Sequence, residues 1–205
     1  MHNEEGTIVN NVFLFGKARG NKTYFLTCTA CLVALTVACQ WLCSLAGIQL
    51  LTGSVVNMFL IFSASLVGLV GAGTVGIITP FIALALGINP NVVLVPFIAL
   101  SNAIIIAVYC LSFLFKQDAP WQGYLFKGVG VVLGATLKFV FMYFVCVKLV
   151  LPLFVESGVL PQPALKNLAT AWGIIQQWAA LIGGAFAVLL ETLLSHKKIR
   201  LIPNN

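Results

Sequence analysis

One lysine and several amide side chains lie deep inside long apolar stretches of this sequence, where they could bind a polar molecule. Lys138 comes eleven residues after Lys127 and ten before Lys148, so its ammonium cannot easily reach either end of its stretch. An ionisable residue at such a depth in a membrane is costly, and by default it marks a functional site. Two interpretations stay open. Lys138 either points into a helix bundle and binds a ligand, or it bonds a helix carbonyl or lies at the lipid boundary.

The amides suit an uncharged polar ligand because each carries both donors and an acceptor. Asn102 follows Pro96 in an apolar stretch, and its amide is equally suited to bonding a neighbouring helix. Trp172 lies one turn before Gln176, near the end of its stretch, where a tryptophan is often an interfacial anchor. We predict one site toward the outer half of the membrane, built from Asn102, Lys138, Tyr143, Trp172, Gln176 and Gln177.

Groups that catalysis needs are missing from the apolar stretches. The five acidic residues fall in tails, loops or the inner end of a stretch, and they are Glu4, Glu5, Asp118, Glu156 and Glu191. No carboxylate pair is therefore placed for acid and base chemistry. The histidines, His2 and His196, lie in the tails, which argues against a metal site or an activated nucleophile. We predict no enzyme, no metal and no cofactor.

The cysteines give no sign of metal or redox chemistry, and no phosphate-binding motif is present. Six cysteines fall inside apolar segments, where a thiol behaves as a small hydrophobic side chain. Cys28 and Cys31 have CxxC spacing, but no second pair or nearby histidine supports a metal site. The sequence has no GxxxxGK motif, so we expect that any energy for transport comes from a gradient or from partners.

The composition identifies the elements that must position these residues. The chain is 60% hydrophobic and 8% charged, far from the roughly 25% charged residues of soluble domains. Both faces of nearly every stretch are apolar, which favours helices over a barrel. The formal charge of +6 comes from basic residues at the ends of stretches, as expected of a membrane protein. We therefore predict no nucleic-acid partner.

Six transmembrane helices fit the apolar stretches in a single membrane domain, 1–205. The predicted spans are about 24–46, 55–70, 73–88, 92–115, 124–150 and 168–194. The second and third make a tight hairpin, and the fifth ends near Pro152. The first twenty residues do not resemble a signal peptide.

Basic residues predict the orientation. Eight lie on the side of the termini, namely Lys17, Arg19, Lys22, Lys116, Lys127, Lys197, Lys198 and Arg200. Lys166 lies clearly on the other side, and Lys148 lies near it. Because cytoplasmic loops carry the excess of Lys and Arg, both termini should be cytoplasmic. We expect a multi-pass protein of the bacterial cytoplasmic membrane.

A stripe of small residues marks the first predicted span. Ala30, Ala34 and Ala38 recur at every fourth position, and small residues at this spacing let helices approach closely. The stripe could contact a partner protein, or equally a neighbouring span of the same chain.

Four separated stretches resemble the substrate-binding S components of energy-coupling factor transporters. They are VGLVGAGTVGIITPFIALALGI, PFIALSNAIIIAV, GATLKFVFMY and QQWAALIGGAFAVL, and the resemblance runs from about Thr29 to Leu194. It implies a six-helix protein that captures a vitamin or similar micronutrient from outside. It also implies a transmembrane coupling subunit and two ATP-binding subunits as partners, with Ala30, Ala34 and Ala38 matching the family's docking pattern. Family ligands lie toward the outer side among the last three helices.

Three functions compete at this point. The leading expectation is an S component of an ATP-driven importer. The alternative is a self-sufficient secondary transporter or channel for a small polar solute, in which Lys138 is a coupling or gating charge. A membrane enzyme acting on lipid is the third, and the scarcity of buried carboxylates and histidines argues against it.

Overall fold

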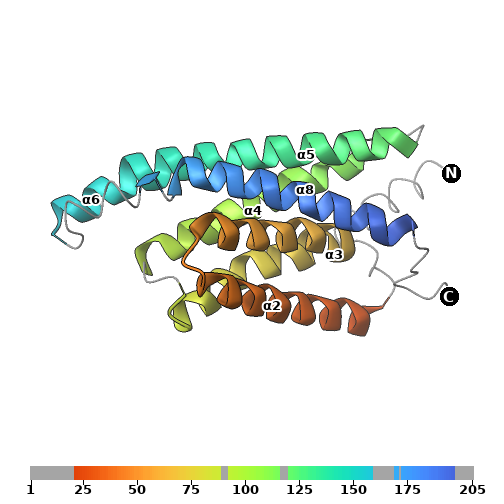
Figure 1. Cartoon of the computed structure of the whole chain (residues 1–205), viewed down its shortest axis with the longest axis horizontal. Helices are drawn as coiled ribbons and strands as arrows, with labels where there is room; N and C mark the ends of the chain where they lie inside the picture. Colours follow the sequence, from red (N-terminus) through yellow and green to blue (C-terminus); the bar gives the residue numbers. More distant parts are fainter. Residues whose placement is uncertain (1–20, 89–91, 116–119, 159–168, 171, 197–205) are drawn as a thin grey trace.

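The computed structural model describes residues 21–88, 92–115, 120–158, 169–170 and 172–196, and these residues form helices and short turns (Figure 1). The helices in chain order are α2 (Lys22–Ser44), α3 (Gln49–Ala85), η2 (Val92–Leu94), α4 (Val95–Leu111), η3 (Ser112–Leu114), α5 (Pro120–Phe141), η4 (Met142–Val150), α6 (Leu151–Glu156) and α8 (Ile174–His196). Within the described residues, five helical segments are long and apolar enough to cross a membrane. The predicted all-α class, with apolar helices of spanning length, is confirmed.

Helix α3 is a hairpin of two helical limbs. Gly68 interrupts it with a φ of 66° and a ψ of −168°, a backbone conformation that is essentially restricted to glycine. A Cβ built on Gly76 would lie 3.6 Å from Leu60 Cδ2, although a straight helix would separate these residues by about 24 Å. The two limbs therefore lie side by side, as Figure 1 shows in orange and gold. The predicted reversal lay between residues 70 and 73, whereas the structure places it at Gly68.

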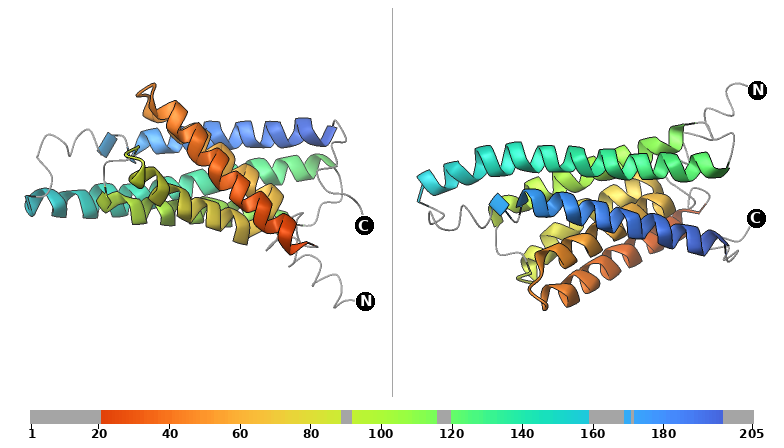
Figure 2. Two further views of the ribbon diagram at one scale, coloured as in Figure 1. Left: turned by 90° about the horizontal axis from the view of Figure 1, so that it is seen from below. Right: turned by 45° about the horizontal axis from the view of Figure 1, so that its top comes forward.

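Helices α5, η4 and α6 form a single long helical rod. The segment from Trp121 to Glu156 has 36 residues, or about 54 Å of helix, which exceeds the bilayer's hydrocarbon core of about 30 Å. The predicted span ended at residue 150, but the rod continues through Pro152. Pro152 lies in the first turn of α6, directly after the π-helical segment η4, and proline is tolerated in a first turn. Figure 2 shows α6 projecting beyond the other helices.

The remaining boundaries differ from the prediction by a few residues. Helix α2 covers residues 22–44 instead of 24–46, and α4 with its flanking 3-10 turns covers 92–114. The last predicted span, 168–194, begins at a residue that lies outside the described part of the chain. In the structure, helix α8 starts at Ile174.

The α3 hairpin forms the centre of the bundle, and it packs against α2, α4 and α8 (Figure 2). The largest core cluster gathers side chains from the hairpin, α4, α5 and α8, including Leu60, Ile61, Val75, Ile105 and Ile106. The start of α2 and the end of α8 lie at the same end of the bundle (Figure 1). The connection between α2 and α3 lies at the opposite end.

Candidate functional site

Lys138 of α5 lies at the centre of a buried polar cluster. Its side chain is only 3% exposed. The ammonium donates to Asn57 Oδ1 of the first α3 limb at 2.8 Å and to Asn102 Oδ1 of α4 at 2.8 Å. Of the two interpretations left open by the sequence, the structure favours a lysine that points into the bundle.

Backbone carbonyls fix the orientation of both amides. Asn57 Nδ2 donates to Gly53 O at 2.8 Å, and Asn102 Nδ2 donates to Gly76 O at 3.1 Å. Because the NH₂ groups are used in this way, the amide oxygens face Lys138. Two oriented acceptors stabilise the protonated lysine through charge-assisted hydrogen bonds.

A narrow pocket of about 60 Å³ leads to this cluster. Lys138, Asn57 and Asn102 line its buried part, and Gln40 of α2 and Gln49 of α3 line it beside the α2–α3 connection. The volume admits a small group or a few water molecules, whereas pockets for drug-sized ligands measure roughly 300–1,000 Å³. A vitamin-sized molecule therefore requires the pocket to widen.

Four of the six predicted site residues line this pocket, namely Asn102, Lys138, Trp172 and Gln176. Trp172 and Gln176 are both buried, so Trp172 is more than an exposed interfacial anchor. The structure brings together residues from α4, α5 and the first turn of α8 with Trp172 just before it, as the sequence predicted.

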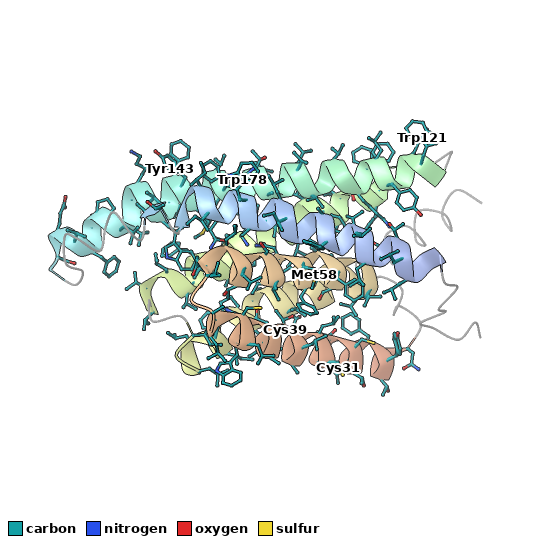
Figure 3. The ribbon with its side chains drawn as sticks, viewed as in Figure 1. Cys31, Cys39, Met58, Trp121, Tyr143 and Trp178 are labelled. Atoms are coloured by element: carbon teal, nitrogen blue, oxygen red, sulfur yellow. The ribbon has the colours of Figure 1, made fainter. Side chains whose placement is uncertain are left out.

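Tyr143 and Gln177 lie elsewhere. Tyr143 stacks on Phe139 with ring centroids 5.9 Å apart, and Lys148 Nζ lies 5.5 Å from its ring. Figure 3 shows Tyr143 on the outer side of the rod, away from α2 and α3. Gln177 Nε2 donates to Thr136 Oγ1 on α5 at 3.5 Å. Neither residue lines the pocket, so both are removed from the proposed site.

Sequence reasoning missed Asn57, Gln40 and Gln49. Asn57 is an isolated amide in the apolar run VVNMFLIF, and the argument applied to Asn102 would have found it. The prediction instead concentrated on the last three spans, and so it overlooked the contribution of α2 and the first α3 limb.

A second polar cluster lies toward the other end of the bundle. Lys127 Nζ is 2.6 Å from Glu191 Oε1, while Ser65 Oγ donates to Glu191 Oε2 at 2.9 Å. The hydroxyl of Tyr109 lies 3.4 Å from the same oxygen. These contacts join the α3 hairpin, α4, α5 and α8 near Gly68. Glu191 thus has a structural partner in Lys127, and it lies outside the Lys138 pocket.

The small-residue stripe of α2 lines an open apolar groove. Ala30, Ala34 and Ala38 are exposed, and with Ile78 and Ile82 of the second α3 limb they border a volume of about 660 Å³. No helix among the described residues covers them. The alternative that the stripe packs against another span of the same chain therefore does not hold for the part of the chain that is described.

Among the described residues, no group of three or more His, Cys, Asp or Glu side chains is arranged to hold a metal ion. Comparison of the chain with protein-family models, curated proteins and solved structures gives no match. The resemblance to S components therefore rests on the four sequence stretches alone.

Proposed function

We propose that this chain is the substrate-capture component of an energy-coupling factor importer in a bacterial cytoplasmic membrane. It binds a vitamin or related micronutrient from the outer side. A transmembrane coupling subunit and two ATP-binding subunits supply the energy and complete uptake.

The observation that carries this proposal is the buried polar pocket around Lys138. Its polar lining comes from α2, both α3 limbs, α4, α5 and the start of α8, so a bound molecule would contact most of the bundle. Gln40 and Gln49 place its accessible side beside the α2–α3 connection, opposite the start of α2 and the end of α8. With cytoplasmic termini, this side faces outward.

The proposal assigns six membrane crossings, counting each α3 limb as one. The limbs 49–67 and 69–85 have 19 and 17 residues on either side of Gly68, or about 28 and 26 Å of helix. These lengths approach the bilayer's hydrocarbon core of about 30 Å. An even number of crossings puts both termini on one side, where the excess of Lys and Arg indicates the cytoplasm.

A self-sufficient secondary transporter or channel for a small polar solute is the second candidate, and the buried charge of Lys138 favours it. Intramembrane ionisable residues occur in ion and proton pathways of such transporters. Lys138→Met should then abolish coupling to a gradient while leaving solute binding largely intact. The capture proposal instead predicts that this substitution weakens binding itself.

The test of the capture proposal uses the full chain, purified gently and analysed by mass spectrometry for retained small molecules. We expect a vitamin or related compound at near one per chain without ATP. In vesicles that contain the chain alone, an imposed ion gradient should produce no uptake of that compound. Gradient-driven uptake by the chain alone would overturn the proposal in favour of the second candidate, and retention of no small molecule would contradict it directly.

The open groove on α2 is the proposed contact for a helix of the coupling subunit. Ala34→Leu should reduce ATP-dependent uptake by cells at least about tenfold, because the larger side chain prevents close helix approach. Binding of the retained compound should stay unchanged, since Ala34 lies outside the Lys138 pocket.

Cys31→Leu is the matched control for the groove. Cys31 is also an exposed small residue of α2, but it does not line the groove, and Figure 3 shows it on the side away from α3. The control should transport normally. Equal transport by the two variants would rule out the groove as the contact.

A further inference from the structure

Among the described residues, no acidic side chain compensates the charge of a protonated Lys138. Its two oxygen partners belong to neutral amides. The described acidic residues are Glu191, which pairs with Lys127, and Glu156, which is exposed on α6. Burying a charge costs several kcal/mol, and neutral acceptors offset only part of that cost. An anion in the pocket would offset more of it.

One donor of the lysine also remains available. An ammonium has three N–H donors, and Asn57 and Asn102 accept two of them. The third has no partner among the described residues. Because Lys138 lines the pocket, an oxygen of a molecule in the pocket can accept this bond. A carboxylate or phosphate oxygen makes the stronger, charge-assisted form of it.

The dimensions of the pocket limit what can reach the lysine. At about 60 Å³, the space suits the end group of a ligand and excludes its whole body. The amides of Gln40, Gln49 and Gln176 line the same pocket, and once it widens they can bond uncharged polar groups on the rest of a ligand. The pocket thus combines one cationic group, the Lys138 ammonium, with several neutral amides.

We infer that the Lys138 pocket selects an organic anion, whose carboxylate or phosphate group pairs with the Lys138 ammonium. This inference names the substrate class of the proposed capture function and rests on it. Asn57 and Asn102 hold the ammonium in place, and the remaining N–H donates to the anionic oxygen.

Acetate and inorganic phosphate are the probes, since they carry the anionic group alone. The full chain in lipid nanodiscs is heated with about 100 mM of either anion, and chloride at equal ionic strength is the reference. At least one of the two anions should raise the melting temperature by about 3 °C or more relative to chloride. The anion that gives the larger rise distinguishes a carboxylate site from a phosphate site. Equal melting temperatures in acetate, phosphate and chloride would overturn the inference.

Two substitutions locate the effect at Lys138. Lys138→Met should remove the response to the anion, whereas Lys148→Met, which deletes an equal charge on the same rod outside the pocket, should retain it. Asn57→Asp provides a carboxylate within the chain, next to the ammonium, and should also remove the response. This third variant keeps the test decisive if Lys138→Met does not fold. A full response in a folded Lys138→Met or Asn57→Asp variant would place the anion elsewhere and overturn the inference.

The inference and the proposed function fail separately. If the purified protein retains a neutral or cationic vitamin, the capture function stands and the anion inference is wrong. If acetate or phosphate stabilises the wild type through Lys138 but the protein retains no small molecule, the anion site stands and the capture function fails.

Discussion

Asn102→Leu is expected to lower the free energy of unfolding by about 3 kcal/mol, because it leaves a buried ammonium short of one of its two acceptors. Lys138 keeps only the 2.8 Å bond to Asn57. The bond from Asn102 Nδ2 to Gly76 O, which joins α4 to the second α3 limb, is lost as well. The measurement is denaturant unfolding of the protein in mixed micelles.

Ser101→Ala is the matched control for this prediction. Ser101 is the neighbouring residue on α4 and is equally buried, but its hydroxyl donates only to Ile98 O within the same helix. Its loss should cost less than about 1 kcal/mol. If both variants have the same free energy of unfolding, the hydrogen bonds of Asn102 to Lys138 and Gly76 contribute nothing measurable to stability.

A double variant separates the charge from the packing. Asn102→Leu leaves the Lys138 ammonium short of one acceptor, and Lys138→Met removes that ammonium. The losses in free energy of unfolding from the two substitutions should therefore not add. We expect the double variant to be more stable than the sum of the single losses by about 1–2 kcal/mol. Strict additivity would show that Asn102 stabilises the bundle independently of Lys138.

Gly183→Ala is expected to cost about 3 kcal/mol or more and to lower the yield of folded protein, because α8 can no longer approach the α3 hairpin. A Cβ at this position would collide with the carbonyl oxygen of Ser54 and lie 2.8 Å from Met58 N. Both atoms belong to helix backbone, which cannot move aside as a flexible side chain can. Forced overpacking of this kind typically costs 1–3 kcal/mol, and a backbone collision lies at the upper end.

Gly128→Ala on α5 is the control, since a Cβ there has no neighbouring atom within 4 Å. It should stabilise the helix by about 0.5–1 kcal/mol, because alanine loses less conformational freedom than glycine on folding. Thermal unfolding and the monodisperse fraction on size-exclusion chromatography measure both variants. Similar melting temperatures and monodisperse fractions for the two variants would contradict the close contact of α8 with α3.

The sequence was sufficient for the class of protein and for the central residue of the site. A chain with this few charges cannot cover a soluble surface, so helices of membrane-spanning length follow directly from composition. Lys138 and Asn102 stand out because each interrupts an apolar run. The every-fourth spacing of Ala30, Ala34 and Ala38 identified one face of α2, but spacing could not show whether that face was covered.

Helix geometry explains the two residues that were placed wrongly. Tyr143 follows Lys138 by five positions and lies in the π-helical segment η4, where it points outward while Met142 lines the pocket. Gln177 is about 100° around from Gln176 and meets Thr136 of α5 instead. For both residues, the sequence could not show the direction in which the side chain points.

By itself, the sequence determined an all-helical, membrane-type chain with a buried lysine, because hydropathy and the depth of a charge are local properties. Only the tertiary structure decided which polar groups meet that lysine. Gly68 folds α3 back on itself, so the limb that carries Asn57 lies beside the limb that carries Gly76, and Asn102 of α4 bonds to Gly76. Residues 57, 102 and 138 are far apart in the chain, and helix packing alone brings them into contact.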